Sequence, residues 1–426
     1  MSARRYDVIV VGTRVAGATT AMLLARCGLR VLAVDRARFP SDTLSTHQVQ
    51  LPAVARLHRW GLLDGIRAAG TPPTRRVRFD VEAGVFEGSF PAHDGVDALY
   101  SPRRTVLDMM LVAAARAAGA DVRQGFHVTD LRWDDGRVCG IRGRTHRGTP
   151  ATESALVIGA DGKRSRVAAA VDARPYRTHA GTTLASYTYW SGLPTTLGEF
   201  YLRPSLAAVA FPTNDDLTMV AVVMSLREFA TFRGDVETAY LKTLDRCGDL
   251  GERVRDAERA ERFRTTPDLP NTFRLPYGPG WALVGDAGLV MDPVTAQGIS
   301  NALRDAELLA DTVTGALRAG RPPDADLADY QRRRDAAALP MYDFTVALAQ
   351  LKPLSAENRR LFAAMAGNQR AIERFLGMYA GVVPVADFFA LRNLIRILGV
   401  RGLAGVAAGR LFRRHRADGQ IPSGAP

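Results

Sequence analysis

The first feature that could do chemistry is a glycine-rich turn followed by a carboxylate. The stretch VIVVGTRVAGATT places Gly12 and Gly17 at the spacing of the first and last glycines in the dinucleotide fingerprint G-x-G-x-x-G. Asp35 ends the next apolar run, about 20 residues further on, where such folds hold a carboxylate that binds a ribose hydroxyl. The pattern predicts a dinucleotide with its pyrophosphate at a helix N-terminus. The alternative is an ordinary strand–helix–strand crossover without a ligand.

The middle glycine of this fingerprint is replaced by Arg14. A glycine at that position lets the backbone approach the phosphates closely. An arginine is compatible only if its backbone angles suit a residue with a Cβ atom and its side chain leaves the phosphates. The case for a dinucleotide therefore depends on the rest of the chain.

Two later stretches also place a carboxylate where a buried strand ends. LVIGADGKRSRV contains Asp161, and WALVGDAGLVMDPVTAQGIS contains Gly285 and Asp286. The second stretch runs through a Pro293 loop into a helix that begins near Gly298. A carboxylate at a strand end can bind sugar-alcohol hydroxyls, and a helix directs its first N–H groups at whatever lies before it.

The elements around these motifs are typical of a parallel sheet. The runs YDVIVVG and LRVLAVDR are apolar throughout, as strands buried on both faces are, and a helix over about 17–28 connects them. Residues 74–100 and 176–232 instead show strand-like alternation. Residues from 325 to 415 show a helical pattern. Together these patterns predict an α/β fold.

In this order, the three motifs resemble those of the flavin-dependent monooxygenases of the p-hydroxybenzoate hydroxylase type, and of the wider superfamily that includes the geranylgeranyl reductases. The resemblance covers about residues 5–320. It implies FAD and a Rossmann-like FAD-binding domain, with an inserted antiparallel β-sheet substrate domain and a helical C-terminal region. The implied segments are 1–73, 101–175 and 275–335 for the FAD-binding domain, 74–100 and 176–274 for the substrate domain, 336–415 for the helical region and 416–426 for a disordered tail.

The resemblance also implies FAD contacts at individual positions. The implied contacts are Gly12, Arg14, Val15, Ala16 and Gly17 at the pyrophosphate, Asp35, Arg36 and Val128 at the adenosine, Asp161, Gly285 and Asp286 at the two carboxylate motifs, and Pro293, Gly298, Ile299 and Ser300 at the isoalloxazine. Arg104 is expected to contact the cofactor ahead of a helix. His47 is expected to reach the FAD phosphates; its alternative is a capping role. We expect the Arg14 side chain to turn toward the flavin, near His47 and the Pro293 loop.

Aromatic side chains gather in the second group of predicted strands. Tyr187, Tyr189, Tyr201 and Phe211 are predicted to line an apolar or aromatic substrate chamber, and the alternative is that they fill the core of the sheet. No acid–base pair or metal-ligating cluster stands out, and in this chemistry the flavin carries the oxygen or the hydride. We therefore expect no metal, and His47 is the candidate for proton transfer.

The expected function is that of a monooxygenase that hydroxylates or epoxidises an apolar or aromatic small molecule through a flavin C4a-hydroperoxide, with NAD(P)H as reductant. The alternatives are a reductase or dehydrogenase that acts on a carbon–carbon double bond, and a flavin-binding scaffold without turnover. Gly288 stands where many hydroxylases have histidine, which slightly favours the reductase. A halogenase is disfavoured because the chain lacks a W-x-W-x-I-P stretch and its first lysine is Lys163.

The composition limits partners and compartment. The net charge is +12, but all except three of the 56 basic residues are scattered arginines, which we attribute to GC-rich coding rather than to nucleic-acid binding. Three widely separated cysteines offer no metal-binding pair and indicate a reducing cytoplasm. No apolar run is long enough for a transmembrane helix. A flavin reductase partner, a homodimer, and contact of the basic, apolar C-terminal segment with a membrane or carrier are left open.

Overall fold

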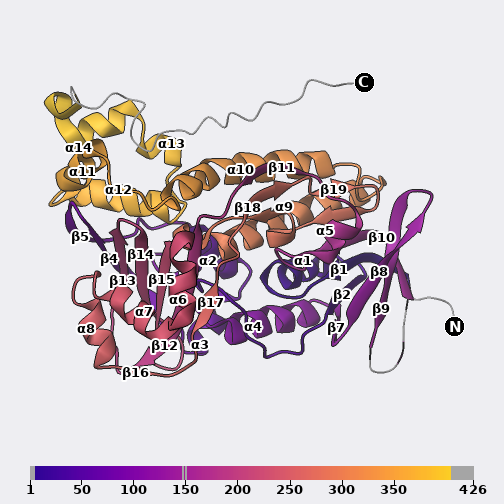
Figure 1. The fold of residues 1–426 in the computed structure, drawn as a ribbon. Helices are drawn as coiled ribbons and strands as arrows, with labels where there is room; N and C mark the ends of the chain where they lie inside the picture. Colours follow the sequence, from indigo (N-terminus) through magenta and orange to yellow (C-terminus); the bar gives the residue numbers. More distant parts are fainter. Residues whose placement is uncertain (1–4, 146–147, 149–150, 404–426) are drawn as a thin grey trace.

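The computed structural model describes residues 5–145, 148 and 151–403, so the tail expected at 416–426 lies outside the described residues. The first of two large sheets, on the right in Figure 1, has the order β19-β20-β10-β1-β2-β7, with the β8–β9 hairpin attached to β10. Its strands are β1 (Arg5–Val11), β2 (Val31–Asp35), β7 (Asp121–Gln124), β8 (His127–Asp134), β9 (Arg137–Arg144), β10 (Ala151–Gly159), β19 (Tyr277–Gly278) and β20 (Trp281–Leu283).

Strand β1 lies in the middle of this sheet because it is apolar on both faces. It runs parallel to β2 and to β10, and β10 runs parallel to β20. One face packs under α1 (Val15–Arg26), α4 (Arg104–Ala117) and α9 (Gly298–Arg318). The other face packs against α5 (Arg166–Ala170) and the β8–β9 hairpin. The carboxyl ends of the parallel strands therefore meet at one edge, where folds of this kind bind their ligands.

The second sheet, on the left in Figure 1, has the order β16-β12-β15-β14-β13-β4-β5, with β17 paired to β12. Its strands are β4 (Arg76–Val81), β5 (Gly84–Ser89), β12 (Thr183–Ser191), β13 (Gly198–Arg203), β14 (Leu206–Pro212), β15 (Thr218–Ser225), β16 (Glu258–Arg259) and β17 (Arg264–Thr266). Its strands pair antiparallel except β13 and β4, which are parallel. Strands β4 and β5 thus belong to a sheet whose other strands begin about a hundred residues later in the sequence.

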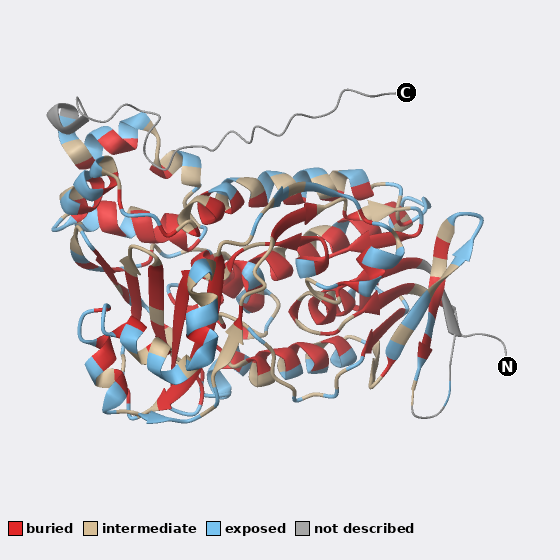
Figure 2. Cartoon of the chain, viewed as in Figure 1, coloured by how far each residue is buried: buried red, intermediate tan, exposed pale blue. Residues whose placement is uncertain are grey.

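Both faces of the second sheet are buried at its central strands (Figure 2), which explains why β14 and β15 are apolar at nearly every position. The outer face is covered by α6 (Phe229–Gly234), α7 (Val236–Leu244) and α8 (Leu250–Arg255). The inner face packs against α11 (Ala356–Met365) and α12 (Gln369–Tyr379). Gly88 on β5 allows this close approach, because a Cβ atom there would lie 2.5 Å from a side-chain carbon of Ile372.

Short elements connect these layers. The short ones are β3 (Pro73–Thr74) with β6 (Leu99–Tyr100), β11 (Pro175–His179) with β18 (Asn271–Arg274) and β21 (Leu289–Val290), the helices α2 (Leu51–Arg59), α3 (Leu63–Ala68) and α13 (Val385–Phe388), and the single turns η1 (Leu226–Glu228), η2 (Gly285–Ala287) and η3 (Pro293–Thr295). The longer helices α10 (Leu327–Leu348) and α14 (Leu391–Leu403) complete the chain's described elements. The expected α/β class, with a second sheet and a helical C-terminal region, is confirmed.

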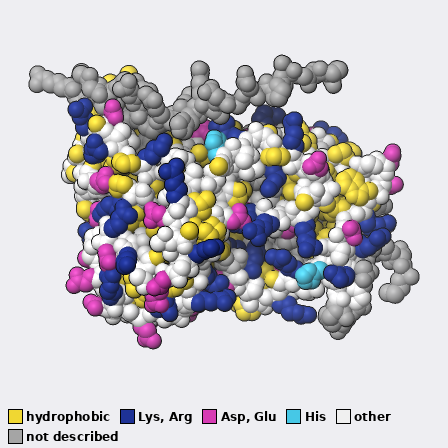
Figure 3. All heavy atoms as spheres, in the orientation of Figure 1, with side chains coloured by type: hydrophobic (Ala, Val, Ile, Leu, Met, Phe, Trp, Pro, Cys, Tyr) yellow, Lys and Arg dark blue, Asp and Glu magenta, His cyan; other side chains and the backbone are white. Residues whose placement is uncertain are grey.

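Surface charge is mixed. Basic and acidic side chains are interspersed over the face shown in Figure 3. Many arginines are paired with carboxylates, as Arg30 is with Asp7 and Arg255 with Asp245. Within the described part of the chain, no helix combines the length and the apolar character that crossing a membrane requires.

Candidate functional site

The turn between β1 and α1 requires glycine at two positions. Gly12 has a φ of 98°, and a Cβ atom on it would lie 2.5 Å from the carbonyl oxygen of Ala160, just after β10. A Cβ atom on Gly17 would lie 1.8 Å from the carbonyl oxygen of Gly12. The first turn of α1 therefore closes on the strand end with no room for a side chain. Its N–H groups have no partner within the helix and are available to an anion.

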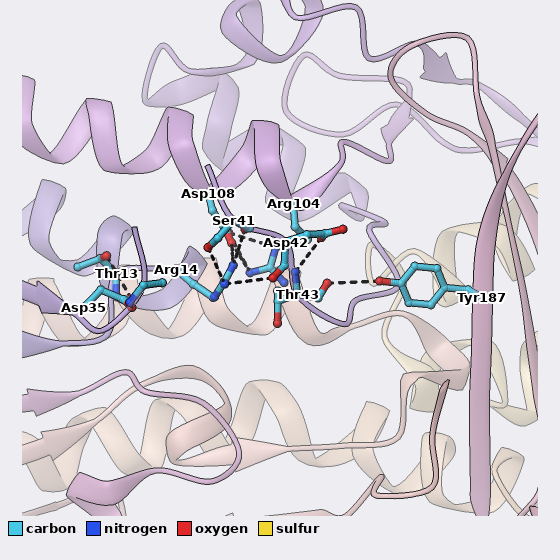
Figure 4. Close-up of polar contacts among 10 residues, drawn as sticks. Thr13, Arg14, Asp35, Ser41, Asp42, Thr43, Arg104, Asp108 and Tyr187 are labelled. Atoms are coloured by element: carbon cyan, nitrogen blue, oxygen red, sulfur yellow. Dashed lines mark hydrogen bonds and ion pairs between the residues drawn. The ribbon is translucent and has the colours of Figure 1, made fainter. Parts of the chain in front are cut away.

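Arg14 fits this turn because its backbone is extended, with a φ of −80° and a ψ of −162°. Its guanidinium leaves the turn toward α4, where Nη1 donates to the carboxylate of Asp108 at 2.5 Å (Figure 4). Nη2 donates to Ser41 Oγ at 3.0 Å, and the guanidinium lies over the ring of Phe39. Asp108 is fully buried and also accepts three bonds from Arg104. The carboxylate is thus shared by two arginines.

This direction differs from the expected one. Arg14 was expected to turn toward His47 and the Pro293 loop, but its hydrogen bonds go to α4 and to residues 41–42. The reason is the buried carboxylate of Asp108, which needs a second charge partner. The arginine replaces the fingerprint glycine, and its guanidinium is held by Asp108 and Ser41.

We predict different outcomes for two substitutions at Arg14. In Arg14→Gly, Asp108 keeps its bonds from Arg104, so we expect a stability loss of about 1 kcal/mol and FAD binding close to that of the parent. Arg14→Glu would place a carboxylate beside a buried carboxylate and near the phosphate position, so it should lose both stability and FAD affinity at low salt. Thermal melts and FAD titrations of the apo-proteins measure this difference. Parental FAD affinity in Arg14→Glu would contradict it.

Asp35 supports the glycine turn from the neighbouring strand. Its carboxylate accepts the N–H of Thr13 at 2.7 Å and the N–H of Ala37 at 2.8 Å. The predicted ribose contact must therefore use remaining lone pairs of the same oxygens. Of the other predicted adenosine contacts, Arg36 is exposed and Val128 is half-buried at the start of β8.

Asp286 shows that this edge encloses accessible space. Gly285 has a φ of 60°, and a Cβ atom there would lie 2.7 Å from the Cβ of Ala16, so η2 closes on α1. Both neighbours of Asp286 are buried, yet its own side chain is exposed. Surrounding protein nevertheless raises the pKa of its carboxyl through burial, and the positive charge of Arg104 opposes this. The carboxylate therefore faces an internal space near Arg104.

The N-terminus of α9 faces accessible space as well. Gly298 is exposed, and a Cβ atom on it would meet no atom within 4 Å. The side chains of Ile299 and Ser300 turn into the core, and the Ser300 hydroxyl accepts the N–H of Gln50 at 3.2 Å. The first turn of α9 thus presents its backbone N–H groups rather than its side chains.

The loop before α9, which we call the 292–297 loop, is held by a buried carboxylate. Asp292 accepts the N–H of Val294 at 2.9 Å and the hydroxyl of Thr183 on β12. Its own N–H donates to the side chain of Asn271 at 2.8 Å. Burial raises the pKa of Asp292 to about 6. The residue connects the loop to strands of two different sheets.

This raised pKa predicts a pH-dependent stability. Between the ordinary aspartate value of about 4 and the folded value of about 6, the unfolded chain loses its proton while the folded protein keeps it. Folding stability should therefore fall with rising pH in that window, by up to about 3 kcal/mol, and level off above it. Chemical unfolding of the parent and of Asp292→Asn from pH 4 to 7 measures this slope by difference. Equal slopes in both proteins would contradict the prediction.

His47 lies beside the second sheet and is enclosed by two tyrosines. Its Nε2 is 2.7 Å from the Tyr189 hydroxyl, its ring meets Tyr187 edge-on, and its φ is 62°. Burial, helped by the charge of Arg104, lowers the pKa of His47 to about 3. The imidazole is neutral at ordinary pH and has no exposed surface. This placement suits a structural contact better than the predicted contact with phosphates.

Arg104 and Asp161 occupy different roles at this edge. Arg104 begins α4, where its charge acts on both His47 and Asp286, so the structure places it centrally. Asp161 instead accepts the N–H groups of Arg166 at 2.7 Å and Val167 at 3.3 Å, and so caps α5. Its predicted contact with FAD has no direct support in these bonds.

The four predicted substrate-lining residues divide between the two faces of the second sheet. Tyr187, Tyr189 and Phe211 lie on the inner face, whereas Tyr201 lies on the outer face. There its hydroxyl donates to Glu199, which also pairs with Arg253 of α8. Strand alternation separates these positions, and we leave Tyr201 out of the substrate wall.

Val209 keeps accessible surface on the inner face and was not among the predicted residues. Strand pairing places Tyr187, Ala221, Val209 and Phe200 in one row across β12, β15, β14 and β13. The others are buried, whereas Val209 in the middle keeps accessible surface. Small side chains next to Val209 could have indicated its accessible surface from the sequence only if the strand register had been known.

The spacing of Arg104 and Asp108, four apart on one helix, was a signal in the sequence for the ion pair between them.

The chain matches known flavoproteins. Residues 5–213 match the family model of an FAD binding domain. Over 386 residues the chain is 30% identical to phenazine 1,6-dicarboxylic acid hydroxylase PhzS of Lysobacter antibioticus, covering 79% of this chain and 91% of that protein. Over 342 residues it is 28% identical to digeranylgeranylglycerophospholipid reductase 2 of Methanothermobacter thermautotrophicus, covering 77% and 83%. The structure of the myxobacterial chondrochloren halogenase CndH matches with a TM-score of 0.74 at 25% identity, covering 90% of this chain and 99% of that chain.

Proposed function

Since this chain belongs to the FAD-binding domain family of flavoproteins, we propose that it is a monooxygenase that hydroxylates or epoxidises an apolar or aromatic small molecule, with NAD(P)H as reductant. The relatives named by the comparisons are hydroxylases, reductases and halogenases, all of them enzymes. The chain is accordingly an FAD-dependent oxidoreductase rather than a scaffold without turnover.

The residues at the sheet edge fit FAD. The first turn of α1 offers N–H groups for the pyrophosphate, beside the side-chain-free surface of Gly12 and Gly17. Asp286 presents a carboxylate to internal space, where ribityl hydroxyls can donate to it. The first turn of α9 at Gly298 offers N–H groups to the isoalloxazine edge, which carries negative charge when reduced. When bound there, FAD supplies the redox chemistry with the reductant and oxygen.

The accessible surface at Val209 carries the proposal for the substrate. It lies on the inner face of the second sheet, in a row with Tyr187 and Phe200. The lining is apolar and aromatic, which suits an aromatic or olefinic molecule. A substrate bound against it would displace water, so that the chain's contribution is to bind and orient the substrate. The neutral imidazole of His47, with a pKa of about 3, offers a hydrogen bond rather than a positive charge near this wall.

A reductase that acts on a carbon–carbon double bond is the second candidate, supported by the archaeal relative. Gly288 adds little to this support. A Cβ atom on Gly288 would lie 3.1 Å from a guanidinium nitrogen of the fully buried Arg334, so packing also favours glycine at this position. The missing histidine is therefore only weak support for the reductase.

Halogenases are among the relatives that share the fold, but the lysines and tryptophan of this chain do not support a halogenase site. The chain has three lysines, and Lys163 pairs with Asp268 while Lys352 is exposed. Lys242 lies on α7, outside the second sheet. Trp190 packs on the outer face of that sheet, against Tyr240. Of these side chains only Lys163 lies close enough to Asp286 for its charge to lower the pKa of that carboxyl, and its ammonium is paired with Asp268.

Rapid mixing of the reduced holoprotein with oxygen tests the proposal. The protein should purify with FAD that acid releases into solution, and NADH or NADPH should reduce it under anaerobic conditions. A transient absorbing species, distinct from both reduced and oxidised flavin, is expected for a monooxygenase. Direct reoxidation in one phase would contradict oxygenation and favour the reductase.

A further inference from the structure

The C-terminal end of α12 is hydrogen-bonded to the 292–297 loop. The hydroxyl of Tyr379 donates to the carbonyl oxygen of Val294 at 2.7 Å. In return, the side-chain amide of Gln297 donates to the carbonyl oxygen of Tyr379 at 2.9 Å and to that of Thr295 at 3.2 Å. All of these groups are buried. Helix α12 thus contacts the loop through the Tyr379 side chain, and the loop contacts α12 through the Gln297 side chain.

The loop needs outside support to keep its shape. Ala296 has a φ of 53°, a left-handed conformation that costs an alanine on the order of 1 kcal/mol. Two residues later Gly298 begins α9, whose first N–H groups face the proposed isoalloxazine position. Any shift of the loop therefore moves the first turn of α9.

We propose that Tyr379 is a positioning residue for the flavin, acting through the 292–297 loop. The inference rests on the proposed placement of FAD at α9. The ring of Tyr379 also packs against Phe200 and Phe79, at centroid distances of 5.4 and 5.3 Å. One side chain thus links the inner face of the substrate sheet to the loop that sets the position of the flavin.

A comparison of Tyr379→Phe with Tyr240→Phe tests this role. Tyr240 is an equally buried tyrosine whose hydroxyl donates to a backbone carbonyl, that of Val220 at 2.9 Å, but on the outer face of the sheet. We expect both variants to show similar decreases in melting temperature. Only Tyr379→Phe should speed FAD dissociation, by about two- to twelvefold, and shift the visible flavin spectrum.

Gln297→Met provides a second variant if Tyr379→Phe folds poorly. It keeps the length of the side chain and removes the bonds to Tyr379 and Thr295, so it should change the flavin spectrum in the same direction. The proposal would be overturned if Tyr379→Phe and Gln297→Met both kept the parental FAD dissociation rate and the parental flavin spectrum. Because these measurements need only bound FAD, a failure of the oxygenation experiment leaves their outcome unaffected.

Discussion

Gly17→Ala is expected to abolish FAD binding. A Cβ atom at this position would lie 1.8 Å from the backbone oxygen of Gly12 and 3.0 Å from the Cβ of Ala160. Backbone atoms cannot move aside as a flexible side chain can, so α1 must shift away from the strand end. We expect a cost at the upper end of overpacking, about 3 kcal/mol or more, and at least a hundredfold loss of FAD affinity.

The matched control is Gly315→Ala in α9. A Cβ atom there would meet no atom within 4 Å, and alanine is the better helix former by about 1 kcal/mol. This variant should retain FAD and melt at or above the parental temperature. FAD titration of both apo-proteins, with circular dichroism to check folding, gives the result. FAD binding in Gly17→Ala at the parental affinity would show that the cofactor does not use the turn.

Asp286→Ala should weaken FAD binding by about five- to 150-fold, or 1–3 kcal/mol. The carboxylate faces internal space beside the first turn of α1, and no hydrogen bond to it is seen among the described residues. Removing it would leave the ribityl hydroxyls without an acceptor. Asp286→Asn keeps the size and one acceptor oxygen, so its loss should be smaller.

Fluorescence titration of FAD into the apo-proteins measures both Asp286 variants. Without FAD, the Asp286 carboxylate has no hydrogen-bond donor, and burial disfavours its charge. Its replacement should therefore leave the melting temperatures of the apo-proteins close to that of the parent. An unchanged FAD affinity in Asp286→Ala would mean that the ribityl chain lies elsewhere.

The parts of the site that the sequence predicted are those set by local geometry. Gly12 and Gly17 are recognisable because a turn of this kind tolerates no Cβ atom at either position, and the structure shows the contacts that would result. The apolar runs of β1 and β2 likewise reveal a buried parallel sheet. The cofactor, FAD, is confirmed by the family match.

The remaining parts depend on pairing across the chain. Tyr201 differs from Tyr187 and Phe211 only in strand register, which determines the face of the sheet on which a side chain lies. The direction of the Arg14 side chain depends on Asp108, 94 residues away. The contact of Tyr379 with the 292–297 loop spans 85 residues and has no local signature.

The parallel pairing at the first sheet sets when FAD can be enclosed during synthesis. The glycine turn is made first, but β10 begins at Ala151, β20 begins at Trp281, and Tyr379 follows close to the end of the chain. Contacts between segments this far apart close slowly, and unpaired strand edges stay exposed until they do. A nascent chain therefore carries its pyrophosphate turn well before the flavin end of the site exists, and full enclosure of FAD cannot precede the synthesis of α9.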